Sequence, residues 1–257
     1  MAKIKRHPKN NFHPLYRLGI GIFAIAILLA CFSCASVKQP TQGKKKIRIT
    51  YRNANRLVEK IKANPNAETL YLFRNGLDSL PEEIGQLKHL KKLVVSSNRL
   101  TYIPPVIGEL TELEKISFKH NKIKALPPEM GKLKNLKQLE LDYNSLDSLP
   151  EELCNLKHLQ YLSLTHNALR CLPSDIGKLQ ELEFLYIGTN QLRKLPVGLS
   201  RLTELKELNV AGSGGLLVIP NMINCQSLER LYIDNTTLFD ASFNPRSIPG
   251  LEIYISR

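Results

Sequence analysis

The feature that most constrains the fold of this chain is a pattern that recurs every 23 residues. The segments LYLFRNGLDSLP, LVVSSNRLTYIP, ISFKHNKIKALP, LELDYNSLDSLP, LSLTHNALRCLP and LYIGTNQLRKLP follow one another at that interval. Each copy carries an asparagine at the same place: Asn75, Asn98, Asn121, Asn144, Asn167 and Asn190. Two weaker copies follow, with Ser213 and Thr236 at the asparagine position. Repetition at this interval predicts a solenoid, in which each unit packs mainly against its two neighbours.

The alternation of leucines within each copy predicts a short β-strand. Around Asn144, for example, Leu139 and Leu141 are expected to point to one face, while the residues between and beside them point to the other. Strands of successive copies would then pair in parallel at about 4.8 Å. The asparagine follows the strand, and its amide both donates and accepts, so we expect it to satisfy backbone groups of the adjoining turns. Prolines such as Pro150 are expected to end the extended segment and turn the chain.

The consensus LxxLxLxxNxLxxLPxxIGxL, over residues 67–250, resembles the leucine-rich repeat family, in the subtype of the Ras-binding-group proteins. The resemblance implies an α/β solenoid: a right-handed horseshoe with a concave parallel β-sheet and about eight repeats. It also implies a binding scaffold, whose ligand is set by variable positions that the family name does not specify.

Both ends of a solenoid need cover. In residues 51–66, Leu57, Val58 and Ile61 recur at helical spacing before Pro65, which predicts an N-terminal capping helix. Residues 251–257 are expected to form a short terminal strand, which limits the exposed sheet edge.

The segment before the repeats has the composition of a targeting signal. Residues 1–17 are basic, and an apolar run of about 15 residues follows at 18–32, shorter than the roughly 20 that a membrane span needs. The run ends in LLAC, which resembles a bacterial lipobox and implies lipidation of Cys31, with Cys34 as the second candidate. This interpretation makes residues 1–30 a lipoprotein-type signal peptide and 31–50 a tether, and it predicts a bacterial protein that is membrane-anchored and extracytoplasmic, either periplasmic or at the cell surface. The alternative is an uncleaved membrane anchor.

The net charge of +13 would suggest nucleic acid as a partner. Nine of the positive charges, however, lie in residues 1–46, which contain no acidic residue, so the repeats carry only about +4. We therefore expect no nucleic-acid binding.

The repeats offer no catalytic or metal-binding pattern. His120 and His166 occupy equivalent positions two repeats apart, about 10 Å at strand spacing, which is too far to share a zinc ion. The run GSGG at residues 212–215 lacks the Gly-Lys-Ser/Thr continuation of a phosphate loop. Cys225 occupies a leucine position, and a bridge between Cys154 and Cys171 is left open. We predict no enzyme activity, no cofactor and no metal.

The candidate site lies on the predicted concave face. Aromatic and histidine side chains gather there on neighbouring strands: Tyr143, Tyr161, His166, Phe184, Tyr186 and Tyr232. Acidic residues are expected to form a rim around them: Glu140, Asp142, Glu207 and Asp234. Exposed aromatics within a charged rim have the composition of a binding hot spot. The alternative is that aromatics simply favour strands and cover one another.

These patterns predict a monomeric, non-enzymatic surface or periplasmic protein that binds another protein through its concave face and the membrane through its N-terminal lipid. Two other functions remain open. One is a surface lectin, since the same rings could stack on sugars, and the other is a structural envelope protein without a specific ligand.

Overall fold

The computed structural model describes residues 3–6, 46–48, 56–213 and 215–256, and the side chains within all of these except 3–6. The predicted apolar leader with Cys31 and Cys34 lies outside these residues. Within the described residues, no helix has the length and apolar character needed to cross a membrane.

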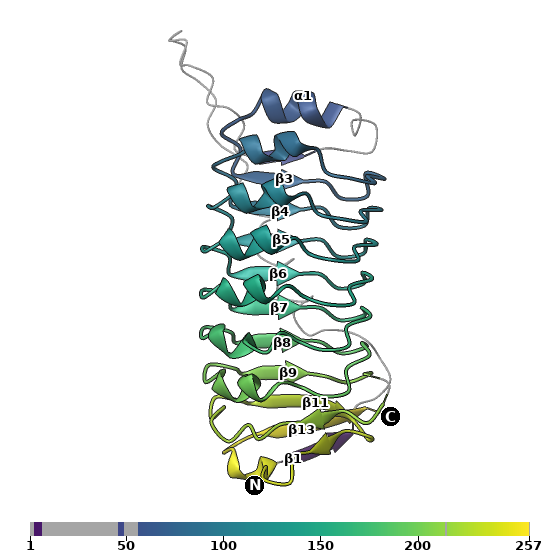
Figure 1. The fold of residues 1–257 in the computed structure, drawn as a ribbon, viewed down its shortest axis with the longest axis vertical. Helices are drawn as coiled ribbons and strands as arrows, with labels where there is room; N and C mark the ends of the chain where they lie inside the picture. Colours follow the sequence, from purple (N-terminus) through teal and green to yellow (C-terminus); the bar gives the residue numbers. More distant parts are fainter. Residues whose placement is uncertain (1–2, 7–45, 49–55, 214, 257) are drawn as a thin grey trace, which may run out of the picture.

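The architecture is a stack of repeats around one parallel sheet (Figure 1). Within the described residues the sheet has 11 strands in the order β1-β13-β11-β9-β8-β7-β6-β5-β4-β3-β2. Its strands are β1 (Lys3–Arg6), β2 (Lys46–Arg48), β3 (Thr69–Tyr71), β4 (Lys92–Val94), β5 (Lys115–Ser117), β6 (Gln138–Glu140), β7 (Tyr161–Ser163), β8 (Phe184–Tyr186), β9 (Glu207–Asn209), β11 (Arg230–Asp234) and β13 (Glu252–Ser256). From β3 to β9, residues 23 positions apart face each other, as the period predicts, for example Gln138 and Tyr161.

On the other side of the stack most repeats carry a short 3₁₀-helix, whereas none is described between β9 and β11. In Figure 1 these helices line one side of the stack. Their bounds are η3 (Glu82–Gln86), η4 (Pro105–Glu109), η5 (Pro128–Lys132), η6 (Glu151–Asn155), η7 (Ile176–Lys178), η8 (Val197–Arg201) and η9 (Pro245–Ser247). A small second sheet pairs β10 (Val218–Ile219) with β12 (Leu238–Phe239).

The repeat leucines form one continuous core. Leu139 and Leu141 are fully buried, and the same cluster runs from Ile47 to Ile253. Because the predicted inward positions are the buried ones, the strand register read from the period is confirmed.

The asparagines connect neighbouring repeats, as predicted. Asn121 donates from Nδ2 to the carbonyl oxygens of Val95, at 2.9 Å, and Phe118, at 2.9 Å, and its Oδ1 accepts from the Leu100 amide at 3.1 Å. Equivalent bonds recur at Asn98, Asn144, Asn167 and Asn190. At the weaker copies the hydroxyls replace part of this set: Ser213 Oγ donates to the Val210 carbonyl at 2.6 Å and Thr236 Oγ1 to the Gly215 carbonyl at 3.2 Å.

The two ends of the stack are built differently. The helix α1 (Leu57–Lys62) lies within the segment predicted to cap the N-terminal end, buries Leu57 and Ile61, and packs against η3. β2, from within the predicted tether, pairs with β3 at that end. At the other end, β1, from within the predicted signal peptide, pairs with β13 in register Lys3 to Glu252, so among the described strands β13 is not the sheet edge.

Candidate interaction surface

We use the term sheet face for one surface of the stack. It is formed by the strand residues that alternate with the buried leucines and by the outward-facing residues that follow each strand. Because the strands pair in register, equivalent residues line up in columns across the sheet. The candidate aromatic residues fall in these columns or beside them, and the structure places them in three groups.

The centre of the sheet face is aromatic. The ring of Tyr161 lies 6.2 Å from that of Phe184 and 5.4 Å from that of Tyr186, centroid to centroid. Tyr161 and Phe184 are partly exposed. Burial raises the pKa of the Tyr161 hydroxyl to about 12, so this ring stays a neutral, amphipathic contact group at physiological pH.

Tyr186 differs from the prediction that it is exposed. It retains only 2% of its accessible surface, because neighbouring side chains that include Tyr161 cover it. Burial, followed by the nearby Glu207 carboxylate, raises the pKa of its hydroxyl. Tyr186 therefore forms the floor of the aromatic cluster and supports Tyr161 from below.

A second aromatic pair lies toward the C-terminal end of the sheet. Tyr232 stacks on Tyr254 at 4.7 Å between centroids, in register across β11 and β13. Tyr254 was not among the predicted site residues. The pattern could have revealed it, because the strand of residues 251–257 continues the same column after Tyr232.

A third group, beside the strands, stacks across three repeats. Tyr143 lies between His120, at 4.4 Å with nearly parallel rings, and His166, at 4.2 Å. From the sequence we considered His120 only as a metal ligand together with His166, and excluded that role. The structure places His120 in the same ring stack as His166. These residues have positive φ, as do Arg74, Ser97 and Thr189 at the equivalent position.

This left-handed position is a property of the repeat itself. The amide of His120 donates to the Asp142 carbonyl at 2.9 Å, and that of Tyr143 to Thr165 at 2.9 Å, so hydrogen bonding continues past the strands despite the unusual backbone. Gly212 has φ +80 at the next equivalent place. The sequence signal is weak, because side chains of many types occupy this position.

The acidic residues predicted to rim the aromatic residues are largely used within the fold. Asp142 is buried, accepts from the Ser163 hydroxyl and from the Thr165 amide at 3.0 Å, and pairs with Lys119 at 2.9 Å. Although burial opposes the charge of Lys119, Asp142 and Glu140 raise its pKa.

Glu207 and Asp234 are also engaged. Glu207 is 5% exposed and accepts from Arg230 Nε at 2.6 Å. Asp234 accepts from the amides of Gly212 and Ser213, on the turn that lacks a repeat asparagine. The carboxylates of Asp142, Glu207 and Asp234 therefore satisfy groups of neighbouring repeats and are not a set of free charges.

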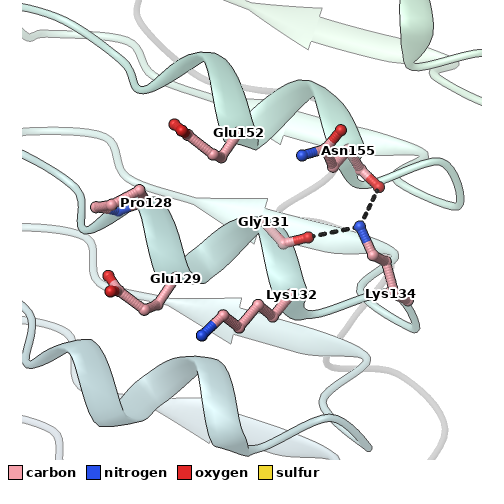
Figure 2. A pocket seen from close by; sticks show the side chains of 7 residues that line it. All are labelled: Pro128, Glu129, Gly131, Lys132, Lys134, Glu152 and Asn155. Atoms are coloured by element: carbon pink, nitrogen blue, oxygen red, sulfur yellow. Dashed lines mark hydrogen bonds between the residues drawn. The ribbon is translucent and has the colours of Figure 1, made fainter.

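A hollow of about 350 Å³ lies between η5 and η6, on the 3₁₀-helix side of the stack (Figure 2). Lys134 Nζ bridges its two walls by donating to the carbonyl oxygens of Gly131, at 2.8 Å, and Asn155, at 3.2 Å. Its charged group is thus used to join adjacent repeats, and we assign no ligand to this hollow.

The described cysteines are free thiols: Cys154 and Cys225 are buried, and Cys171 is exposed. The bridge between Cys154 and Cys171 is therefore not formed in this structure. Among the residues that the structure describes, no group of three or more His, Cys, Asp or Glu side chains is placed to hold a metal ion.

Comparison with known proteins supports the repeats. A family model described as leucine-rich repeat region matches residues 147–244, and one described as leucine rich repeat matches residues 111–169. A comparison with curated proteins finds no match. The chain contains leucine-rich repeats, and repeats of this kind generally mediate protein–protein interaction.

Solved structures of several leucine-rich repeat proteins are similar. A leucine-rich repeat protein of Leptospira interrogans matches with 27% identity and a TM-score of 0.54, over 81% of this chain and 63% of that one. The plant peptide hormone receptor RGFR1, solved in complex with RGF2, matches with 26% identity and a TM-score of 0.64, over 80% of this chain and 33% of the receptor. The leucine-rich repeat domain of the type III effector XopL shares the fold, with 22% identity and a TM-score of 0.62 over 80% of this chain and 88% of that one. The chain thus spans less than two thirds of the first two proteins.

Proposed function

We propose that this leucine-rich repeat chain is a non-enzymatic, lipid-anchored extracytoplasmic protein that binds another protein through its sheet face. The observation that carries the binding role is the partly exposed pair of Tyr161 and Phe184, supported from below by buried Tyr186. Rigid aromatic side chains that are already packed lose little conformational entropy when a partner covers them. The plant receptor in the comparison is, by its description, a receptor for a peptide hormone, which supports a protein or peptide as the class of ligand.

The anchor rests on sequence alone. The basic segment, the apolar run and the LLAC sequence before Cys31 are the features on which it depends. The intact mass of the protein purified from native membranes tests it. A chain that begins at Cys31 and carries an acyl-glyceryl group supports the proposal, whereas a chain that retains Met1 and the apolar run would make the segment a membrane anchor.

Affinity capture of cross-linked partners, followed by mass spectrometry, tests the binding role. The full chain would be compared with a Tyr161→Ala/Phe184→Ala variant, which removes the exposed rings and leaves buried Tyr186 in place. The matched control is Tyr102→Ala/Val197→Ala, since these two exposed side chains lie outside the strands. We expect at least one protein to be captured by the parent and the control and lost from the sheet-face variant.

Two outcomes would contradict the proposal. If the captured proteins are the same for all three chains, the sheet face is not the interaction surface. If no protein is captured but the parent binds a glycan array in a Tyr161-dependent manner, the chain is a lectin, a function for which stacked rings are also suited.

A further inference from the structure

One end of the sheet face is strongly basic. Lys46 Nζ lies 5.0 Å from the centroid of the Tyr71 ring, Lys92 Nζ lies 5.4 Å from it, and the Arg48 guanidinium carbon lies 5.9 Å from it. These four residues, which we term the basic cluster, come from the three adjacent strands β2, β3 and β4. Lys46 and Arg48 are exposed, and Lys92 and Tyr71 are partly exposed.

The charges of the basic cluster are not compensated by the rest of the described fold. Neither Lys46, Arg48 nor Lys92 forms an ion pair with any described acidic residue. The next cations along the face, by contrast, have acidic partners: Lys115 lies 3.7 Å from Glu140, and Lys119 pairs with Asp142. Uncompensated positive charge is therefore concentrated at the first strands of the sheet.

This arrangement opposes folding unless something offsets it. Lys92 lies directly opposite Lys115 in the sheet, and like charges at opposed positions destabilise strand pairing. The pKa of Lys115 reflects this repulsion. Burial, and then the charges of Lys92 and Lys119, lower that pKa, although the attraction of Glu140 opposes them. Cation–π contacts with Tyr71 act against this repulsion. A bound anion would remove it.

The distribution of charge limits the size of that anion. Farther along the sheet face, on β9, β11 and β13, lie Glu207, Asp234 and Glu252, with Arg230 among them. A long polyanion laid across the sheet would be repelled there, whereas a short acidic segment confined to β2–β4 would not. Neighbouring strands of the sheet lie about 4.8 Å apart, and side chains on one side of an extended peptide lie roughly 6.8 Å apart. Because these spacings are similar, successive carboxylates of such a peptide can reach cations on different strands.

We propose that the basic cluster is the docking site for a short acidic peptide segment of the partner protein, with carboxylates at Lys46, Arg48 and Lys92 and a neighbouring side chain over Tyr71. The inference rests on the proposed function and specifies the chemistry of the partner. The basic cluster would orient an acidic segment, and the aromatic centre at Tyr161 and Phe184 would contact the part of the partner that follows it.

The test uses a fluorescent decaglutamate peptide and the full chain, with fluorescence anisotropy at about 50 mM NaCl, where screening is weak. The variant is Arg48→Glu/Lys92→Glu. The control is Lys132→Glu/Lys157→Glu, which changes the net charge equally at two exposed lysines, one at the end of η5 and one just after η6. Circular dichroism melting of each variant confirms that it is folded.

We expect the basic-cluster variant to bind decaglutamate at least about tenfold more weakly than the parent, since two attractive contacts become repulsive, with a much smaller change in the control. Equal weakening in both variants, or no measurable binding by the parent, would overturn the inference. So would tighter binding of a ten-residue oligothymidine or of phosphatidylglycerol vesicles than of decaglutamate, because the site would then serve a nucleic acid or a lipid surface.

The same variants separate this inference from the proposed function. If partner capture depends on Tyr161 and Phe184 but not on Arg48 and Lys92, the acidic-segment inference fails and the binding role stands. If capture depends on neither pair, the binding role itself fails, whatever decaglutamate does.

Discussion

Asn144 Nδ2 donates to the carbonyl oxygen of Phe118, 26 residues earlier, at 3.0 Å. The same amide accepts from the Ile123 N–H at 3.1 Å through Oδ1 and donates to Leu141 in its own repeat at 2.9 Å. One side chain therefore satisfies backbone groups of two repeats that no strand ladder reaches, which explains why this residue recurs with the period.

We expect Asn144→Ala to lower the free energy of unfolding by about 1–3 kcal/mol, because backbone donors and acceptors would be left unsatisfied at the turn. The measurement is urea denaturation followed by circular dichroism. Asn155→Ala is the control, since Asn155 is exposed and its backbone carbonyl, which alanine retains, accepts from Lys134 Nζ and from the Lys157 amide. A similar loss of stability in both variants would argue against a specific role of the asparagine ladder.

The second prediction concerns Gly108 in η4. A Cβ at this position would lie 2.5 Å from the carbonyl oxygen of Glu129 in the next repeat, and backbone cannot move aside as a side chain would. Gly108→Ala is therefore expected to destabilise by about 1–3 kcal/mol through overpacking. Gly215→Ala is the matched control, because a Cβ there meets nothing within 4 Å. Thermal melts of the two variants should differ clearly, and equal melting temperatures would contradict the close packing of η4 on η5.

Cysteine reactivity provides a third prediction. Burial raises the pKa of the Cys154 thiol to about 12 and that of Cys225 to about 11, whereas Cys171 is exposed. We expect iodoacetamide at about pH 7.5 to modify Cys171 at least about tenfold faster than the two buried thiols, because the thiolate is the reactive form. Peptide mapping by mass spectrometry gives the three rates, and labelling in urea is the control in which the difference should disappear. Protection of Cys171 in the native protein would indicate that it is covered or bridged.

The fourth prediction is a pH dependence that arises at His166. Burial, and then the nearby His120, lower its pKa below the usual value of about 6.5 for histidine, against the opposing effect of Asp142. The folded state therefore binds fewer protons there than the unfolded state, so the contribution of neutral His166 to stability is present above about pH 6.5 and is lost as the pH falls through the folded-state pKa. Urea denaturation of the parent and of His166→Gln should show the parent losing more stability than the variant between about pH 7.5 and pH 5. The opposite order would mean that the stack with Tyr143 favours the charged ring.

The repeat period by itself determined the register of the strands from β3 to β9, the buried leucines and the hydrogen-bonding role of the asparagines. These features depend on alternation and on a fixed interval, which are local properties of the sequence. The same columns also identified which aromatic residues would be neighbours on the sheet face.

Only the tertiary structure decided how exposed those neighbours are. Strands about 4.8 Å apart bring each outward side chain against two others, so the sizes and charges of the flanking residues determine whether it is covered. Tyr186 is buried beside Tyr161. The Glu207 carboxylate pairs with Arg230, and the Asp142 carboxylate binds Ser163 and Lys119. The pairing of β2 with β3, which brings Lys46 and Arg48 to Tyr71, also lies outside the repeat pattern, because β2 comes from a segment with no copy of the consensus.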